Sequence, residues 1–145
     1  MKGQCNCGAV KFEIDNFVPK FFEYHCSLGL EQEVSASITA TIIGYEKLHW
    51  LTGLEKISTW ENNIGILTDF CSVCGSLVPK SLKDPSYYWV PAGSFKNVKV
   101  EICAHVYIDS KGEWDNITSE KVIYNKEPDI TELVCLLSGE EFAYS

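Results

Sequence analysis

Two close pairs of cysteines constrain this chain more than any other feature of its sequence. The pairs are Cys5-Asn6-Cys7-Gly8 and Cys71-Ser72-Val73-Cys74-Gly75, and a glycine directly follows the second thiol of each. Zinc prefers soft sulfur donors, and two cysteines this close form a short chelating loop. Glycine suits the sharp turn around an ion because it adopts positive φ without steric cost. We therefore predict one structural Zn²⁺, bound by Cys5, Cys7, Cys71 and Cys74.

Disulfides and a redox motif are the alternatives for these four thiols. Neighbouring thiols in C-x-C and C-x-x-C bridge poorly within a pair, and two crossed bridges would crowd each other. No apolar export segment follows Met1, so we expect a reducing, cytoplasmic location in which disulfides are rare. A thioredoxin-like C-x-x-C opens a helix, whereas Leu77-Val78-Pro79 after the second pair indicates a strand and a turn. These observations favour structural zinc.

Length and charge limit the classes of function. A chain of 145 residues predicts one domain over residues 1–145, and 46% apolar content is typical of a globular protein. The net charge of −8 predicts repulsion from nucleic acid and from anionic membranes. No apolar run reaches the ~20 residues of a membrane span. We expect neither nucleic acid nor a membrane as a partner.

The apolar residues alternate along most of the chain, which predicts a mainly β fold of short antiparallel sheets. Strands are expected over residues 10–14, 36–42, 48–52, 57–61, 65–70, 87–90 and 102–108. Near the end the period changes to i, i+3, i+4, i+7, which predicts a C-terminal helix over about 129–139. Asp129 occupies the N-cap position of a capping box. Trp60, Trp89 and Trp114 are expected to be apolar anchors.

An ordered set of motifs resembles the glutathione-dependent formaldehyde-activating enzyme family, which includes the centromere protein V domain. The opening Gln4–Phe12 is similar to the family's G-x-C-x-C-G-A-V-x-F, and Phe70–Ser76 to its F-C-x-x-C-G-S/T. Segments at 48–53, 90–94 and 104–114 resemble later family motifs in the same order. The resemblance covers about residues 3–127. It implies a β-tent fold and zinc held by the four cysteines named above.

Active members of that family also carry a second cysteine claw, C-H-C-S-x-C-R/K, which holds a catalytic-type zinc. The matching stretch here is Tyr24-His25-Cys26-Ser27-Leu28-Gly29-Leu30, in which only the middle thiol remains. A catalytic zinc keeps three protein ligands, and a tyrosine phenol with a pKa near ~10 is a poor replacement for a thiolate. This stretch therefore does not predict a second ion. Cys26 and His25 are the residues left to carry catalysis.

Two functions follow from these observations. The first is a zinc-binding domain that keeps its structural ion and has lost or altered its reaction. The alternative is an active carbon–sulfur lyase that forms S-hydroxymethylglutathione from formaldehyde and glutathione, using Cys26, with a small thiol such as glutathione as its partner. His105 shares a predicted strand face with Cys103, and its first interpretation is a structural histidine. A rebuilt site that joins Cys26 to Cys103 and His105 is a further hypothesis.

Overall fold

The computed structural model describes residues 1–15, 19–25, 37–82, 86–96, 98–99, 101–115 and 121–138. The chain folds into two compact units, one of residues 1–18 and 43–98 and the other of residues 19–42 and 99–145. The chain passes from the second unit into the first within strand β4. The expected single domain over residues 1–145 stays a prediction.

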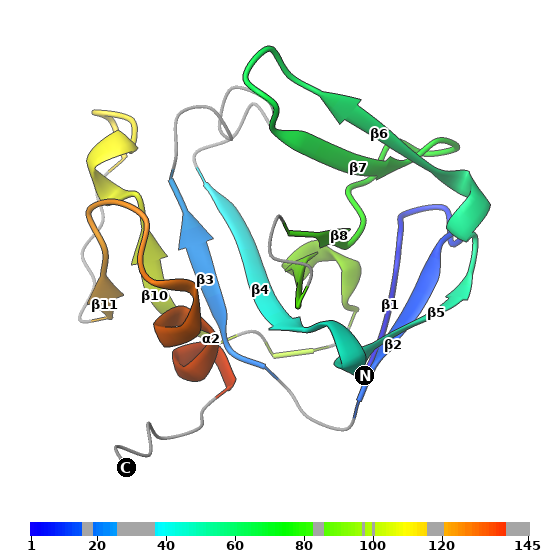
Figure 1. Cartoon of the computed structure of the whole chain (residues 1–145), viewed down its shortest axis with the longest axis horizontal. Helices are drawn as coiled ribbons and strands as arrows, with labels where there is room; N and C mark the ends of the chain where they lie inside the picture. Colours follow the sequence, from blue (N-terminus) through cyan, green and yellow to red (C-terminus); the bar gives the residue numbers. More distant parts are fainter. Residues whose placement is uncertain are drawn as a thin grey trace. The chain divides into compact units, whose positions relative to one another are not determined.

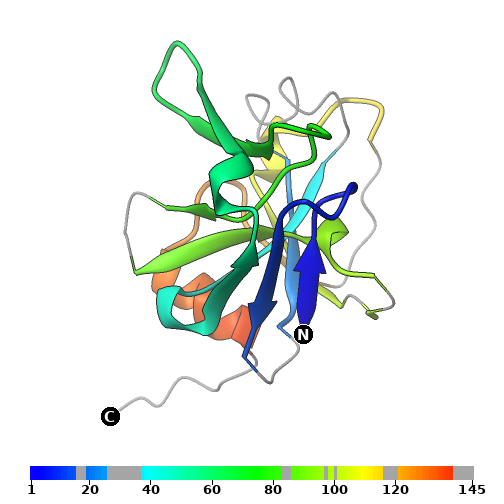
Figure 2. The same cartoon turned by 90° about the vertical axis from the view of Figure 1, so that its right-hand side faces the viewer.

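The first unit consists of short antiparallel strands, and three 3₁₀ turns lie between or after some of them (Figure 1). Its three-stranded sheet has the order β1–β2–β5, and β6 pairs with β7 and β8 with β9. The loop between β6 and β7 extends away from the three-stranded sheet, as both Figure 1 and Figure 2 show. The bounds are β1 Lys2–Gln4, β2 Lys11–Ile14, β5 Leu48–Thr52, β6 Ile57–Glu61, β7 Leu67–Cys71, β8 Lys80–Ser81 and β9 Tyr87–Pro91, with 3₁₀ turns η1 Tyr45–Lys47, η2 Leu54–Lys56 and η3 Ala92–Ser94.

The second unit places four strands in the order β11–β10–β3–β4. The pairs β3–β10 and β10–β11 are parallel, whereas β3–β4 is antiparallel. The backbone N–H of Lys20, just before β3, donates to the carbonyl of Leu137 in α2. The bounds are β3 Phe21–Tyr24, β4 Ile38–Gly44, β10 Ile102–Val106, 3₁₀ turn η4 Ile108–Ser110, β11 Val122–Ile123 and α2 Ile130–Ser138.

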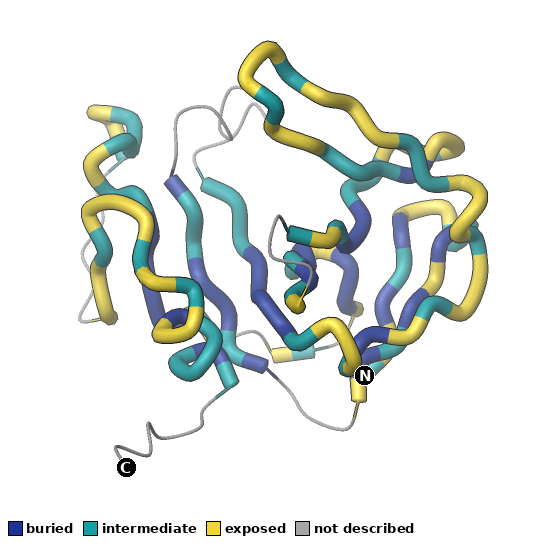
Figure 3. The backbone as a smooth tube through the Cα atoms, in the orientation of Figure 1, coloured by how far each residue is buried: buried dark blue, intermediate teal, exposed yellow. Residues whose placement is uncertain are grey.

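Alternating burial explains why these segments form strands. In β2, Phe12 and Ile14 are buried whereas Lys11 is exposed, and the Phe12 ring meets those of Trp50 and Phe95 edge-on. The middle of β4 is buried on both faces, and the buried hydroxyl of Thr41 donates to the Lys20 carbonyl at 2.8 Å. Figure 3 shows this buried stretch of β4 in contrast with the exposed and half-buried residues of the β6–β7 hairpin.

The mainly β class with short sheets and a C-terminal helix is confirmed, and β5 and β6 have the predicted bounds. The antiparallel expectation holds for the first unit, but β10 pairs in parallel on both sides. The predicted strand 102–108 ends at Val106, because Tyr107 has a left-handed φ of 58° and a 3₁₀ turn follows. Trp60 and Trp114 are 48% and 71% exposed, so they are not the buried anchors that the sequence predicts. No helix among the described residues is both long and apolar enough to cross a membrane.

Candidate metal centre

The first cysteine pair lies in the tight turn that joins β1 to β2. The backbone N–H of Cys5 donates to the Val10 carbonyl, and the Gly8 N–H donates to the Cys5 carbonyl at 3.1 Å. Gly8 has φ +79°, the left-handed conformation expected of the glycine in such a turn. The Val10 N–H points at sulfur and donates to Cys5 Sγ at 3.3 Å.

The second pair repeats this arrangement at the end of β7. Cys71 N–H donates to the Ser76 carbonyl at 2.9 Å, and Gly75 N–H donates to the Cys71 carbonyl at 2.8 Å. Gly75 has φ +78°. A direct bond links the two turns, because the backbone N–H of Asn6 donates to the Ser76 hydroxyl at 3.1 Å.

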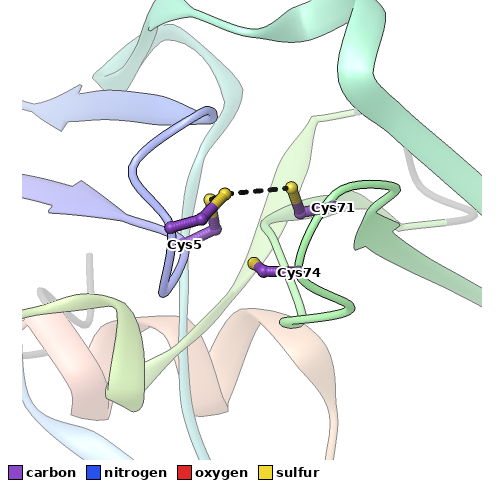
Figure 4. Close-up of side chains that lie close together, drawn as sticks. Cys5, Cys71 and Cys74 are labelled. Atoms are coloured by element: carbon purple, nitrogen blue, oxygen red, sulfur yellow. Dashed lines mark hydrogen bonds between the residues drawn. The ribbon is translucent and has the colours of Figure 1, made fainter.

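The four thiols converge between these two turns, and Figure 4 shows those of Cys5, Cys71 and Cys74. The sulfur of Cys7 lies 3.6 Å from that of Cys5 and 3.9 Å from that of Cys71. All four sulfur atoms lie within 4.8 Å of one another. A tetrahedral zinc with Zn–S bonds of about 2.3 Å places its sulfur ligands about 3.8 Å apart. The donor set and its spacing therefore fit zinc, and the structure brings together all four predicted ligands.

The cluster is anchored on one side in the core and open on the other. Cys5 and Cys71 are 2% and 0% exposed and pack with Val10 and Val78, whereas Cys7 is exposed and Cys74 is half-buried. Buried, rigid ligands with amide hydrogen bonds to sulfur are typical of a structural site, and the exposed Cys7 leaves a path for the ion to enter.

The thiols of the metal-free cluster differ in their pKa. Hydrogen bonds from the Ser76 side chain and backbone lower the pKa of Cys74 to about 5. The Ala9 amide lowers the pKa of Cys7, but burial and the neighbouring thiols outweigh it and raise that pKa to about 11. Burial raises the pKa of Cys5, but the Val10 amide and the thiols of Cys7 and Cys71 outweigh it, so the net shift is downward. Close thiolates repel one another, and a divalent cation removes that obstacle to full ionisation.

The predicted catalytic residues lie in the second unit. His25 directly follows β3, and its side chain is 1% exposed. Its Nε2 lies 3.1 Å from Nδ1 of His105, a contact that the sequence analysis missed because nothing in it paired β3 with β10. Cys26 lies outside the described residues, so its role and the rebuilt site with Cys103 and His105 stay hypotheses. Tyr24, at an outer position of the degraded claw, packs edge-on against the Tyr107 ring at 5.2 Å.

The sequence matches the family described as "Glutathione-dependent formaldehyde-activating enzyme" over residues 1–110. The chain belongs to this family. A crystal structure of a protein from Rhodobacter sphaeroides has a similar fold, with a TM-score of 0.56 and 23% sequence identity over 68% of this chain and 91% of that protein. No curated protein matches the sequence. The family match spans both cysteine pairs of the metal centre.

Proposed function

We propose that this protein is a zinc-binding domain in which Cys5, Cys7, Cys71 and Cys74 hold one structural Zn²⁺, and in which the family reaction is lost or altered. The observation that carries the zinc assignment is the convergence of four thiols within 4.8 Å from two turns far apart in the sequence. The ion would hold these turns together by its own bonds and neutralise their charge.

The altered reaction rests on the chemistry of the second claw. The outer thiol positions hold Tyr24 and Gly29, and the basic position after the claw holds Leu30 followed by Glu31. The Tyr24 side chain packs against Tyr107. A single remaining thiol, Cys26, does not supply the three ligands that a catalytic zinc needs. The loss of a basic residue also removes attraction for a carboxylate-bearing thiol.

Metal analysis combined with a reaction assay tests this proposal. The purified protein should contain zinc that is lost on Cys71→Ser and unchanged on Cys26→Ser. Exchange spectroscopy by NMR should show no acceleration of the spontaneous reaction between formaldehyde and glutathione. The alternative is the active carbon–sulfur lyase. In that case the protein should accelerate the reaction of formaldehyde with glutathione, and Cys26→Ser should lose both this acceleration and part of the bound zinc.

A small anionic thiol such as glutathione remains our proposed ligand class, in a binding rather than a catalytic role. In the first unit, Lys2, Lys11 and Lys96 line a pocket together with Gln4 and Ser94. Three lysines around one pocket favour a carboxylate-bearing ligand on a chain that is otherwise acidic. Titration with glutathione, followed by amide NMR, should shift resonances of these residues, and Lys11→Glu should abolish the shifts.

A further inference from the structure

The second unit contains a cluster of metal-ligating side chains that uses none of the four clustered cysteines. We propose that Glu23, His25 and His105 form a second metal site for a divalent cation of the zinc type. One donor atom from each of the three residues lies within 4.8 Å of the other two. This site is independent of the structural zinc, because its residues come from the other compact unit.

Strand pairing places these three side chains together. Glu23 and His25 lie two positions apart, so they project from the same side of an extended backbone. β10 runs parallel to β3 with His105 opposite Glu23, and the His25 N–H donates to the Val106 carbonyl at 2.9 Å. The backbone hydrogen bonds that flank the cluster therefore fix the backbone positions from which the three side chains extend.

The three distances between the donor atoms are close to those between ligands around one metal ion. Nε2 of His25 lies 3.1 Å from Nδ1 of His105, and Oε2 of Glu23 lies 3.7 Å from the first atom and 3.4 Å from the second. Ligands bound at about 2.0–2.2 Å around a tetrahedral zinc lie about 3.3–3.5 Å apart. A single N–H between the rings would account for one of these three distances, whereas one cation accounts for all three.

A fourth residue completes the pattern around His25. Its other ring nitrogen, Nδ1, lies 3.7 Å from Oδ2 of Asp115. Histidine ligands of zinc commonly direct their second nitrogen toward a carboxylate, which orients the ring and raises its basicity. The carboxylates of Glu23 and Asp115 together balance the charge of a divalent ion.

Burial and donor type indicate the class of metal. The side chains of His25 and His105 are 1% and 8% exposed, and that of Glu23 is 27% exposed, so an ion would reach the site from the side of Glu23. Two imidazoles and one carboxylate suit zinc and its first-row neighbours, and three protein ligands leave one position for water or a ligand. Such an open position is the arrangement of catalytic rather than structural zinc.

Metal titration of the 145-residue protein, purified with zinc on its four clustered cysteines, tests the site. Added Co²⁺ should produce visible ligand-field bands without thiolate-to-metal charge-transfer bands, because the donors are nitrogen and oxygen. Zinc titrated against a competing chelator should give one further equivalent per chain. Glu23→Gln and His105→Gln should lose that equivalent, and Asp115→Asn should weaken it by about 10–100-fold. Long-range ¹H–¹⁵N spectra should report coordination through Nε2 of His25 and Nδ1 of His105.

His49 supplies a matched control, because it is the one histidine of the chain outside the proposed site and it also lies close to a carboxylate. Its Nε2 lies 2.8 Å from Oδ1 of Asp15 at an exposed position. His49→Ala should retain the second equivalent, and so should Cys26→Ser. The proposal is overturned if the unaltered protein binds no metal beyond its cysteine-dependent ion. It is also overturned if Glu23→Gln retains the cobalt bands, or if His49→Ala removes them.

Discussion

Cys7 and Cys71 are 64 positions apart in the sequence, yet their sulfur atoms lie 3.9 Å from each other. The two turns that carry them are also joined by the bond from the Asn6 N–H to the Ser76 hydroxyl. One neutral hydrogen bond contributes only about 1 kcal/mol, which is small against the entropy of closing so long a loop. A metal ion shared by the two turns would add much stronger bonds at this point.

Replacement of one buried thiol should therefore both release zinc and destabilise the fold. Cys71→Ser substitutes a poor zinc ligand at a position that is 0% exposed. Loss of a structural metal belongs to the mutations that cost more than about 4 kcal/mol. For a chain of this length that cost lowers Tm by more than about 10 °C. Calorimetry and elemental analysis of the same sample measure both effects.

Cys135→Ser is the matched control for this prediction. Cys135 is a half-buried cysteine of α2 and is not one of the four clustered thiols. Its replacement should leave the zinc content unchanged and lower Tm by only a few degrees. The four-thiolate assignment is wrong if Cys71→Ser melts like the unaltered protein and keeps its zinc.

Acid should weaken the metal centre, and the Cys74 thiol sets the pH window in the metal-free protein. Its pKa is lowered from 9.0 to about 5, chiefly by the Ser76 hydroxyl. A lowered pKa stabilises the folded state above the unfolded value of 9.0, and this contribution is lost as the pH falls through about 5. Protonation of the thiols also releases zinc, so zinc content measured against pH should fall in acid.

The same shift predicts which thiol of the metal-free protein reacts first. At pH 7 Cys74 is a thiolate, whereas Cys7, with a pKa of about 11, is protonated. Iodoacetamide should therefore alkylate Cys74 before Cys7, and Ser76→Ala should move the midpoint of the pH dependence of Cys74 alkylation upward because the pKa of Cys74 rises. Ser72→Ala, in the same turn, should leave the rate unchanged. Equal rates at Cys7 and Cys74 by mass spectrometry would contradict these pKa values.

The cysteine centre was predictable because its information is local. Each pair, with its glycine, specifies a turn that points two thiols in one direction, and only the meeting of the two turns depends on residues far apart in the sequence. The cluster of Glu23, His25 and His105 has no such local signature. His105 approaches His25 only because β10 pairs in parallel with β3. Parallel strands are not joined by a short turn, so no local sequence pattern predicts that these two strands pair.

The strand boundaries show the same division between local and long-range causes. β5 and β6 have their predicted bounds because turn residues flank them, and Gly53 separates them. The strand expected over 102–108 stops at Val106, where Tyr107 takes a left-handed conformation that glycine usually provides. The sequence also did not predict that Trp114 is exposed, because a single tryptophan does not indicate whether its side chain faces the core or the solvent.

The N-terminal end of α2 leads to a prediction about the stability of the second unit that does not involve a metal. Oδ1 of Asp129 accepts the backbone N–H groups of Thr131 and Glu132 at 3.0 and 3.1 Å, which is the expected N-cap. Glu132 does not complete a capping box, because Oε1 accepts the Tyr124 hydroxyl at 3.1 Å. Asp129→Ala should cost about 1 kcal/mol and Asp129→Asn much less, measured by urea unfolding. Equal losses for both variants would show that charge, rather than the cap, stabilises this helix end.

Gly53 connects the fold of the first unit to the position of the first cysteine pair. It has φ +84°, and a Cβ at this residue would lie 2.0 Å from the carbonyl oxygen of Ala9. Ala9 directly precedes Val10, whose amide donates to Cys5 Sγ. Gly53→Ala should therefore lower the free energy of unfolding by more than the roughly 1–3 kcal/mol that backbone strain alone would cost. It should also weaken zinc binding.

Gly65→Ala is the matched control, because φ is +85° there but the nearest atom, Glu61 Oε1, lies 3.7 Å away. That variant should lose about 1 kcal/mol and keep its zinc affinity. If both variants lose the same stability and neither loses zinc, contact with Ala9 does not position the metal ligands.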